Sequence, residues 1–209
     1  ALLHHRPALA ALPRAGIVHR LDKDTSGVMV VAASLKAHAS LVDQLQERRM
    51  GRIYRAVAHG LAPERGTVDA PIGRHPRDRK RMAVVEGGKP AVTHFRRLAG
   101  RAGFCHLELS LESGRTHQIR VHLQQLGFPL VGDPVYGRRH PRMADSAGLS
   151  EQALAAVRDF PRQALHALRL KLEDPASGRE RRFEAPLPRD FTALLEALGL
   201  AIDRDVGGT

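Results

Sequence analysis

A polar turn at residues 16–27 carries the side chains of this chain that are best suited to do chemistry. Its ionisable members are His19, Arg20, Asp22, Lys23 and Asp24. The apolar run 28–32 follows directly, and charged groups beside a protein interior cost free energy unless they are paired or take part in a reaction. We therefore interpret Asp22 as the centre of an active site, although an isolated Asp in a turn more often bonds its own backbone.

Two residues elsewhere are candidates to work with such a carboxylate. Arg115 follows Gly114 at the start of an expected helix, and an adjacent guanidinium would keep a carboxylate ionised. Tyr54 is one of only two tyrosines in a chain without tryptophan, so few other side chains could stack on a nucleobase. Each has a simpler reading: Arg115 as a surface or phosphate-facing cation, and Tyr54 as an aromatic residue of the core.

Several common kinds of site do not fit the sequence. There is no glycine-rich phosphate loop that ends in Lys-Ser or Lys-Thr, and Ser113 lacks the spacing of a nucleophile elbow. Cys105 is the single cysteine, so no cysteine pair can bind zinc. His117 and His122 are separated by about 140° around a helix and do not share a face. We therefore expect no bound metal.

The charge of the chain favours a polyanionic partner. Lys and Arg total 33 against 22 Asp and Glu, which gives a net charge of +11. Nucleic acid is the commonest partner of such a protein. One loop concentrates this charge and would suit phosphate contacts, or would simply be solvated; its cations are Arg74, Arg77, Arg79, Lys80 and Arg81. A single cysteine suits a reducing compartment, and we expect a cytoplasmic protein without a membrane span.

Hydrophobic periodicity predicts more strands than helices. The expected strands are 27–33, 52–59, 67–69, 89–98, 104–111, 163–172 and 181–185. The expected helices are 35–49, capped by Ser34, and 117–126, 150–160 and 191–200. Only 27–59 reads as a β-α-β unit. This order predicts an α+β fold with a large, mostly antiparallel or mixed sheet.

Five motifs, in this order, resemble the pseudouridine synthases that modify ribosomal RNA, in the family named after the large-subunit enzyme A. They lie at 19–27, 52–56, 114–122, 132–137 and 162–167, and the first begins His-Arg-Leu-Asp. The segments 71–76, 81–84 and 88–94 are most similar to the D-type members, whose targets are uridines in a stem-loop of 23S ribosomal RNA. The resemblance covers residues 1–200.

The resemblance implies a fold and a domain organisation. It implies a bent β-sheet flanked by helices around a central catalytic cleft, with residues 1–200 as the catalytic domain and 201–209 as a C-terminal tail. D-type members carry a small S4-like RNA-binding domain before the catalytic domain, and nothing in this sequence corresponds to it. We expect a monomer that acts without a cofactor on large-subunit ribosomal RNA or on a precursor of that subunit.

The resemblance also implies residue roles. Asp22 is expected to be the catalytic nucleophile and Arg115 its salt-bridge partner, whereas Asp24 belongs to the scaffold of the turn. Tyr54 is expected to stack on the target base, and Arg20 to fill the gap left by the extruded uridine. Two other functions stay open: a non-catalytic RNA-binding or ribosome-assembly factor, and a metal nuclease. A synthase that acts on another ribosomal or transfer RNA uridine is a further alternative.

Overall fold

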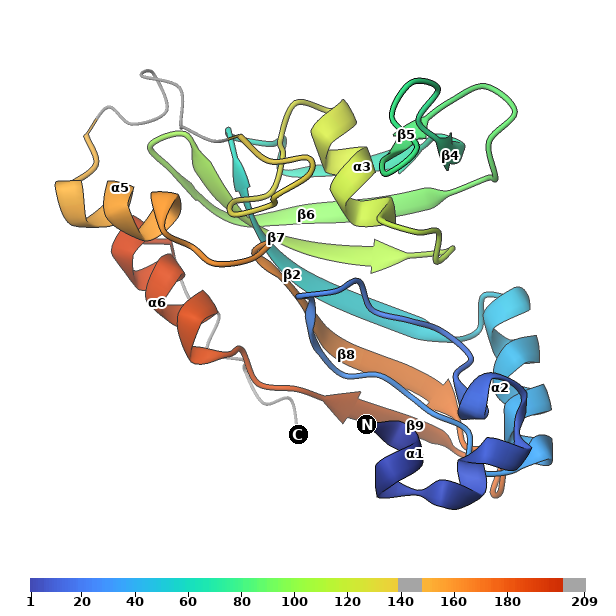
Figure 1. Cartoon of the computed structure of the whole chain (residues 1–209). Coiled ribbons are helices and arrows are strands. Elements are labelled where there is room, and N and C mark those ends of the chain that lie inside the picture. The colour runs from blue at the N-terminus through green and yellow to red at the C-terminus, as the bar shows by residue number, and fades with distance from the viewer. Residues whose placement is uncertain (139–147, 201–209) are drawn as a thin grey trace.

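A seven-stranded mixed sheet forms the centre of the molecule (Figure 1). The structure, a computed structural model, describes residues 1–138 and 148–200, so the tail expected at 201–209 lies outside the described residues. The strand order is β1-β8-β2-β7-β6-β3, and β9 also pairs with β8. The strands are β1 (Ser26–Gly27), β2 (Gly51–His59), β3 (Arg65–Asp69), β6 (Val92–Arg101), β7 (Phe104–Leu111), β8 (Leu165–Glu173) and β9 (Glu180–Glu184).

All strand pairs of this sheet are antiparallel except one. The exception is β1, which pairs in parallel with β8 through Ser26 and Gly27. Strand β8 thus joins the N-terminal turn to the central strand β2, which pairs with β8 on one side and β7 on the other. The predicted α+β class with a large mixed sheet flanked by helices is confirmed.

The four predicted helices are present, with ends that lie within about three residues of the predicted ones, and the short helix α1 was not predicted. The bounds are α1 (Leu2–His5), α2 (Leu35–Gln46), α3 (Gln118–Gln125), α5 (Glu151–Arg158) and α6 (Arg189–Leu198), and two short 3-10 turns, η1 (Pro7–Ala11) and η2 (Pro13–Gly16), follow α1. Ser34 caps α2 as predicted, because its Oγ accepts a hydrogen bond from the Ala37 amide. Helix α3 stops before Gly127, whose φ of 86° suits glycine.

The strand predicted at 27–33 is wrong beyond its first residue. Only Ser26 and Gly27 pair with β8, and the following residues run as irregular chain apart from one bridge between Val31 and Ile17. Val28 and Val30 instead pack on the apolar cluster under α2. Packing against a helix and pairing in a sheet both need apolar side chains, so the composition of this run does not distinguish them.

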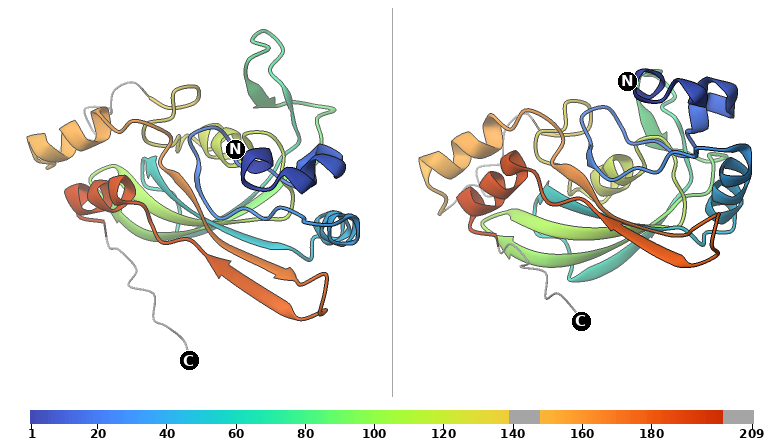
Figure 2. Two further views of the ribbon diagram at one scale, coloured as in Figure 1. Left: turned by 60° about the horizontal axis from the view of Figure 1, so that its bottom comes forward. Right: turned by 90° about the horizontal axis from the view of Figure 1, so that it is seen from below.

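Two clusters of apolar side chains cover opposite faces of β7. Cys105, Leu107 and Leu109 pack in the cluster that includes Ile119 and Leu123 of α3. On the other face, Phe104 belongs to the cluster formed with α5 and α6, and the ring of His106 meets that of Phe191 of α6 edge-on. Figures 1 and 2 show α3 over one face of the sheet and α5 beside α6 near the other. Helix α3 is therefore anchored on the sheet face that carries Tyr54.

A separate two-stranded hairpin projects beside α3. It consists of β4 (Ile72–Arg74) and β5 (Met82–Val84), and the basic loop joins its two strands (Figure 1). The β6–β7 turn is tighter than the predicted strands 89–98 and 104–111 imply, because Arg101 already pairs with Phe104. Ala102 and Gly103 both have positive φ there, as a two-residue hairpin turn requires. In the described ranges, no helix has the length and apolarity that crossing a membrane requires.

Candidate active site

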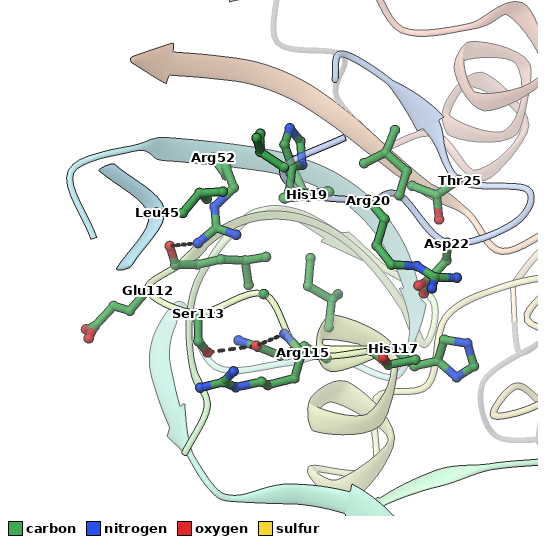
Figure 3. A pocket seen from close by; sticks show the side chains of 18 of the residues that line it. His19, Arg20, Asp22, Thr25, Leu45, Arg52, Glu112, Ser113, Arg115 and His117 are labelled. Carbon is green, nitrogen blue, oxygen red and sulfur yellow. Dashed lines mark hydrogen bonds between the residues drawn. The ribbon is translucent and has the colours of Figure 1, made fainter. Parts of the chain in front are cut away.

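A pocket of about 610 Å³ lies between the N-terminal turn, strand β2 and the start of α3. It is lined by Arg20, Asp22, Tyr54 and Arg115, the four residues singled out in the sequence for the target nucleotide. These residues come from three distant parts of the chain. The close view in Figure 3 shows Asp22 and Arg20 on one side and Arg115 below them.

The turn that presents Asp22 is held from behind by strand β8 and the residues just before it. The Thr25 amide donates to the Asp22 carbonyl oxygen at 3.0 Å, which closes the turn. The buried side chain of Gln163 donates through Nε2 to the Lys23 carbonyl oxygen at 2.6 Å and to the Thr25 hydroxyl at 2.9 Å. Arg162 donates to the Asp24 carbonyl oxygen at 3.3 Å. The scaffold role predicted for the turn thus rests on residues 162–163, which belong to the last of the five motifs.

Gly27 fixes how closely the turn approaches β8. Its φ is 120°, and a Cβ there would lie 2.1 Å from the Ala167 carbonyl oxygen. No other residue could occupy this position without moving the backbone, so glycine allows the parallel pairing of β1 with β8.

His19 is a neutral member of the turn. Its Nε2 accepts a hydrogen bond from the Val30 amide at 3.2 Å, so the ring proton of the neutral form lies on Nδ1. Burial, with a contribution from the positive charge of Arg52, lowers the pKa of His19 to about 4. The imidazole therefore serves as a fixed hydrogen-bonding group at neutral pH.

Asp22 forms a salt bridge with Arg120 of α3. The Arg120 Nη1 donates to Asp22 Oδ2 at 3.2 Å, and the side chains are 5% and 14% exposed, respectively. The other donors of the guanidinium, Nε and Nη2, bind the two oxygens of Asp133 at 2.7 and 2.9 Å. Burial alone would lower the pKa of Arg120, but Asp133 and Asp22 raise it above its ordinary value. One cation thus lies between two carboxylates.

Asp22, Arg120 and Asp133 form a triad, and Asp133 is its fixed member. Its side chain is fully buried, and its Oδ1 also accepts from the backbone amides of Val135 and Tyr136. Burial would raise the pKa of Asp133, yet these hydrogen bonds, with those of Arg120, hold it below the usual range. Asp133 thus takes the fork of Nε and Nη2, and Asp22 is bound through Nη1.

The predicted salt bridge between Asp22 and Arg115 is wrong. Arg115 lies before the first turn of α3, its side chain is exposed, and its Nε donates to the Pro90 carbonyl oxygen at 3.0 Å. Its backbone amide donates to Gln118 Oε1 at 3.0 Å, which fixes the entry to the helix. Arg120 is five residues farther on, inside the helix and facing the turn. Arg115 therefore lines the pocket without neutralising Asp22.

Both partners in this network stand in motifs visible in the sequence, yet sequence reasoning gave them no role. Arg120 lies in the 114–122 motif between Ile119 and Val121, and Asp133 lies in the 132–137 motif. The usable signal was a charged residue flanked by apolar residues in a helix expected to pack on the sheet. Such a residue needs a buried counter-ion, and Asp133 was available.

Tyr136 connects this network to the β4–β5 hairpin. The Arg120 guanidinium lies 5.1 Å from the centre of its ring. Its hydroxyl accepts from the Met82 amide at 2.8 Å and lies 2.9 Å from His117 Nδ1. On the outer side, Arg81 lies 5.2 Å from the same ring. The hairpin is thereby attached to the residue under the Asp22–Arg120 pair.

The other cations of the basic loop lie away from the pocket. Arg74, Arg77, Arg79 and Lys80 are exposed, and Arg74 donates to the Arg79 carbonyl oxygen at 3.0 Å. None of them, nor Arg81, lines the pocket that contains Asp22. Their contact with RNA stays a prediction.

Tyr54 lies on the floor of the pocket, from the middle of β2. Its side chain is almost completely buried, and burial raises the pKa of its phenol above the ordinary value of 10.0. The phenol is therefore protonated at neutral pH. An ionised carboxylate, a protonated phenol and several cations thus line one pocket, an arrangement suited to nucleophilic or general-base chemistry on an anionic ligand.

The fold of this chain is that of the RNA pseudouridylate synthase domains. Human RNA pseudouridylate synthase domain containing 4 superposes with a TM-score of 0.70 at 27% identity, over 89% of this chain and 76% of that one. Human RNA pseudouridylate synthase domain containing 1 superposes with a TM-score of 0.65 at 29% identity, over 85% and 71%. A family model described as RNA pseudouridylate synthase matches residues 4–125. The chain belongs to this family, as the sequence motifs predict.

Curated relatives are more similar in sequence. Ribosomal large subunit pseudouridine synthase D of Pseudomonas aeruginosa is 54% identical over 198 residues, which is 95% of this chain and 61% of that protein. The protein of the same name from Escherichia coli K12 is 53% identical over 95% of this chain and 60% of that protein. The predicted similarity to D-type members is confirmed. The chain spans about three fifths of the length of these relatives.

Proposed function

We propose that this chain isomerises uridine to pseudouridine in large-subunit ribosomal RNA, and that Asp22 is its nucleophile. The observation that carries the proposal is the position of Asp22 in the pocket, bound by a single donor of Arg120. A carboxylate held in this way is oriented, while its second oxygen has no hydrogen bond among the described residues. The names of the relatives support ribosomal RNA as substrate, and stem-loop uridines of 23S RNA are the proposed targets.

The reaction moves a bond without a change of redox state. The glycosidic bond from uracil N1 to the ribose C1′ breaks, the uracil turns, and C5 bonds to C1′. C5 then loses its proton and N1 gains one, so the product has the same atoms as the substrate. The carboxylate of Asp22 attacks C1′, attacks C6 of the uracil, or assists formation of a glycal. Each route requires the ionised form that Arg120 maintains, and none requires a cofactor.

Other residues of the pocket would also take part in the reaction or in RNA binding. A stacked uridine hides its glycosidic bond, so the base must leave the helix. Tyr54 would stack on the base, and its protonated phenol could hand over or receive a proton. Arg20, which is exposed beside the turn, would fill the gap in the RNA. Arg115, freed from the role of neutralising Asp22, would contact RNA from the pocket, as would the basic loop.

The proposed substrate also implies the compartment in which the protein would work. A protein that modifies large-subunit RNA or its precursor particle would work in the cytoplasm, and we propose that it does so as a monomer. Residues 1–200 would form the catalytic unit.

The test compares Asp22→Asn with Asp24→Asn, a carboxylate two residues away in the same turn. Each protein is incubated with large-subunit RNA, and pseudouridine is detected by carbodiimide-dependent stops in primer extension. We expect Asp22→Asn to bind RNA and form no product, and Asp24→Asn to form it. Undiminished product from Asp22→Asn would show that Asp22 is not the nucleophile. RNA binding without product from the wild-type chain would favour a non-catalytic binding factor, and loss of activity with EDTA would favour a metal nuclease.

A further inference from the structure

Arg52 is a buried arginine that has no carboxylate partner among the residues the structure describes. Its side chain points into the pocket from β2, and the residue is 6% exposed. Its Nε is buried and has no hydrogen-bond partner, and its Nη2 lies 3.5 Å from the Leu111 carbonyl oxygen, at the limit of a hydrogen bond. The guanidinium therefore has unused donors in a place where water is scarce.

The two other buried arginines of the described chain are paired. Arg55, on the same strand, lies 2.9 Å from a carboxylate oxygen of Glu108. Arg120 holds both Asp22 and Asp133. A buried charge without a counter-ion costs several kcal/mol in a folded protein, in the general case. Arg52 thus differs from its neighbours in a way that points to a missing anion.

The surroundings of Arg52 hold it in place without neutralising it. A Cβ at position 114 would lie 2.7 Å from its Nη1, so Gly114 leaves room for the guanidinium. Glu112 also lines the pocket, but its two oxygens are bound by Arg48 and His94. Burial lowers the pKa of Arg52. Arg52 and His19 line the same pocket, and the charge of Arg52 contributes to the low pKa of His19.

The position of Arg52 relative to Tyr54 fits one nucleotide. The two residues are two positions apart on β2, so their side chains share a face, about 6.6 Å apart along the strand. Tyr54 and Asp22 line the same pocket as Arg52. In Figure 3 Arg52 and Asp22 lie at opposite ends of the pocket. A base over Tyr54 with its sugar at Asp22 therefore leaves the adjoining backbone within reach of Arg52.

We propose that Arg52 binds a phosphodiester group of the RNA strand, at the linkage next to the uridine that enters the pocket. The planar guanidinium carries several donors in a fixed geometry that matches the oxygens of a phosphate. His19 lines the same pocket, and its neutral ring carries its proton on Nδ1, which is a further donor there. The inference rests on the proposed function, since it takes RNA as the ligand, but it concerns binding and not the chemical step.

The first experiment leaves the protein unchanged at position 52. A set of stem-loop RNAs is prepared in which one phosphate at a time, around the target uridine, is replaced by a neutral methylphosphonate. Binding is measured with Asp22→Asn, so that turnover does not alter the RNA. We expect one linkage next to the target to lose affinity about 10- to 100-fold, the range for one charge-assisted hydrogen bond. A scan in which no such linkage responds would overturn the proposal.

The second experiment links that phosphate to Arg52. Arg52→Gln, in the same Asp22→Asn protein, should lose a similar factor with unmodified RNA and then be indifferent to the methylphosphonate at that linkage. Arg182→Gln, which removes the same charge at an exposed position, should keep the full sensitivity. If Arg52→Gln also keeps it, the phosphate is bound by another residue and the proposal is wrong. Gly114→Ala, which crowds the guanidinium, should weaken sensitivity to the same linkage, and unchanged sensitivity would contradict the contact.

The two proposals fail in different ways. A wild-type chain that forms no pseudouridine, but whose Asp22→Asn variant shows the linkage-specific loss of affinity, contradicts the proposed function and supports the phosphate contact. An active wild-type chain with no sensitive linkage contradicts the contact alone.

Discussion

Arg120 donates a single hydrogen bond, of 3.2 Å, to the carboxylate of Asp22, although a guanidinium can donate two to a carboxylate. Asp133 occupies the face formed by Nε and Nη2. The second oxygen of Asp22 has no hydrogen bond among the described residues and is left for the pocket. A carboxylate that is oriented and only half bound is suited to attack a substrate, whereas a fully clamped one would be a structural ion pair.

Arg120→Lys should reduce the rate of pseudouridine formation about 100-fold or more. Lysine keeps the charge but cannot bind Asp133 through a planar fork while it also reaches Asp22. Arg115→Lys is the matched control and should change the rate only a few-fold, because Arg115 does not bind Asp22. The rates of the two variants are compared in single-turnover experiments with saturating enzyme. A larger loss for Arg115→Lys than for Arg120→Lys would restore Arg115 as the residue on which the carboxylate depends.

Asp133→Asn should destabilise the protein by about 3–5 kcal/mol, the range for breaking a buried ion pair. The change leaves the buried guanidinium of Arg120 with a neutral partner and weakens the acceptor for two backbone amides. Urea unfolding followed by circular dichroism measures the loss. Glu180→Gln, at an exposed pair on β9, is the control and should leave the unfolding midpoint unchanged. Equal midpoints for wild type and Asp133→Asn would contradict the structural role of the triad.

Gln163→Leu should slow the reaction more than its loss of stability explains. The substitution removes the hydrogen bonds to Lys23 and Thr25 that hold the Asp22 turn. Gln44 provides the control, since it is equally buried and bonds the backbone of Glu173 at the far end of the sheet. Each Leu variant should lose about 1–3 kcal/mol of stability.

Only Gln163→Leu should also lower kcat and speed hydrogen exchange at the Thr25 amide. Similar activity in the two Leu variants would show that the turn does not depend on this anchor.

Protonation of His19 should make the protein less stable in acid. Its pKa is about 4 when folded and 6.5 in the unfolded chain, so below pH 6.5 the unfolded chain binds the proton more readily. Stability attributable to this residue is therefore fully present above pH 6.5 and is lost as the pH falls to about 4, by up to about 3 kcal/mol.

His19→Gln, whose side-chain oxygen can still accept from Val30, should reduce the difference in unfolding free energy between pH 7 and pH 5. Other buried histidines remain in both proteins, so the comparison isolates His19. The same pH dependence in both proteins would mean that His19 titrates normally in the folded state.

Local sequence signals predicted most elements because the physical causes were local. Ser34 before an amphipathic run predicted α2, whose first turn it caps. Hydrophobic periodicity predicted the strand at 104–111, which is β7. The prediction of a strand at 27–33 was wrong because Val28 and Val30 are apolar in order to pack under α2, and apolar composition does not reveal whether the backbone is paired.

The sequence by itself determined the family, the carboxylate Asp22, and the residues that come with it into the pocket, because these are carried by short motifs whose residue types are visible in the chain. It did not determine which arginine neutralises Asp22. Arg115 and Arg120 stand in one motif, five residues apart, and the start of α3 at Gln118 separates them. The helix turns Arg120 toward Asp22 and Asp133, whereas Arg115 stays on the preceding loop and bonds Pro90. That choice depends on the docking of α3 against the sheet, and so on contacts between residues about 100 positions apart, which only the tertiary structure brings together.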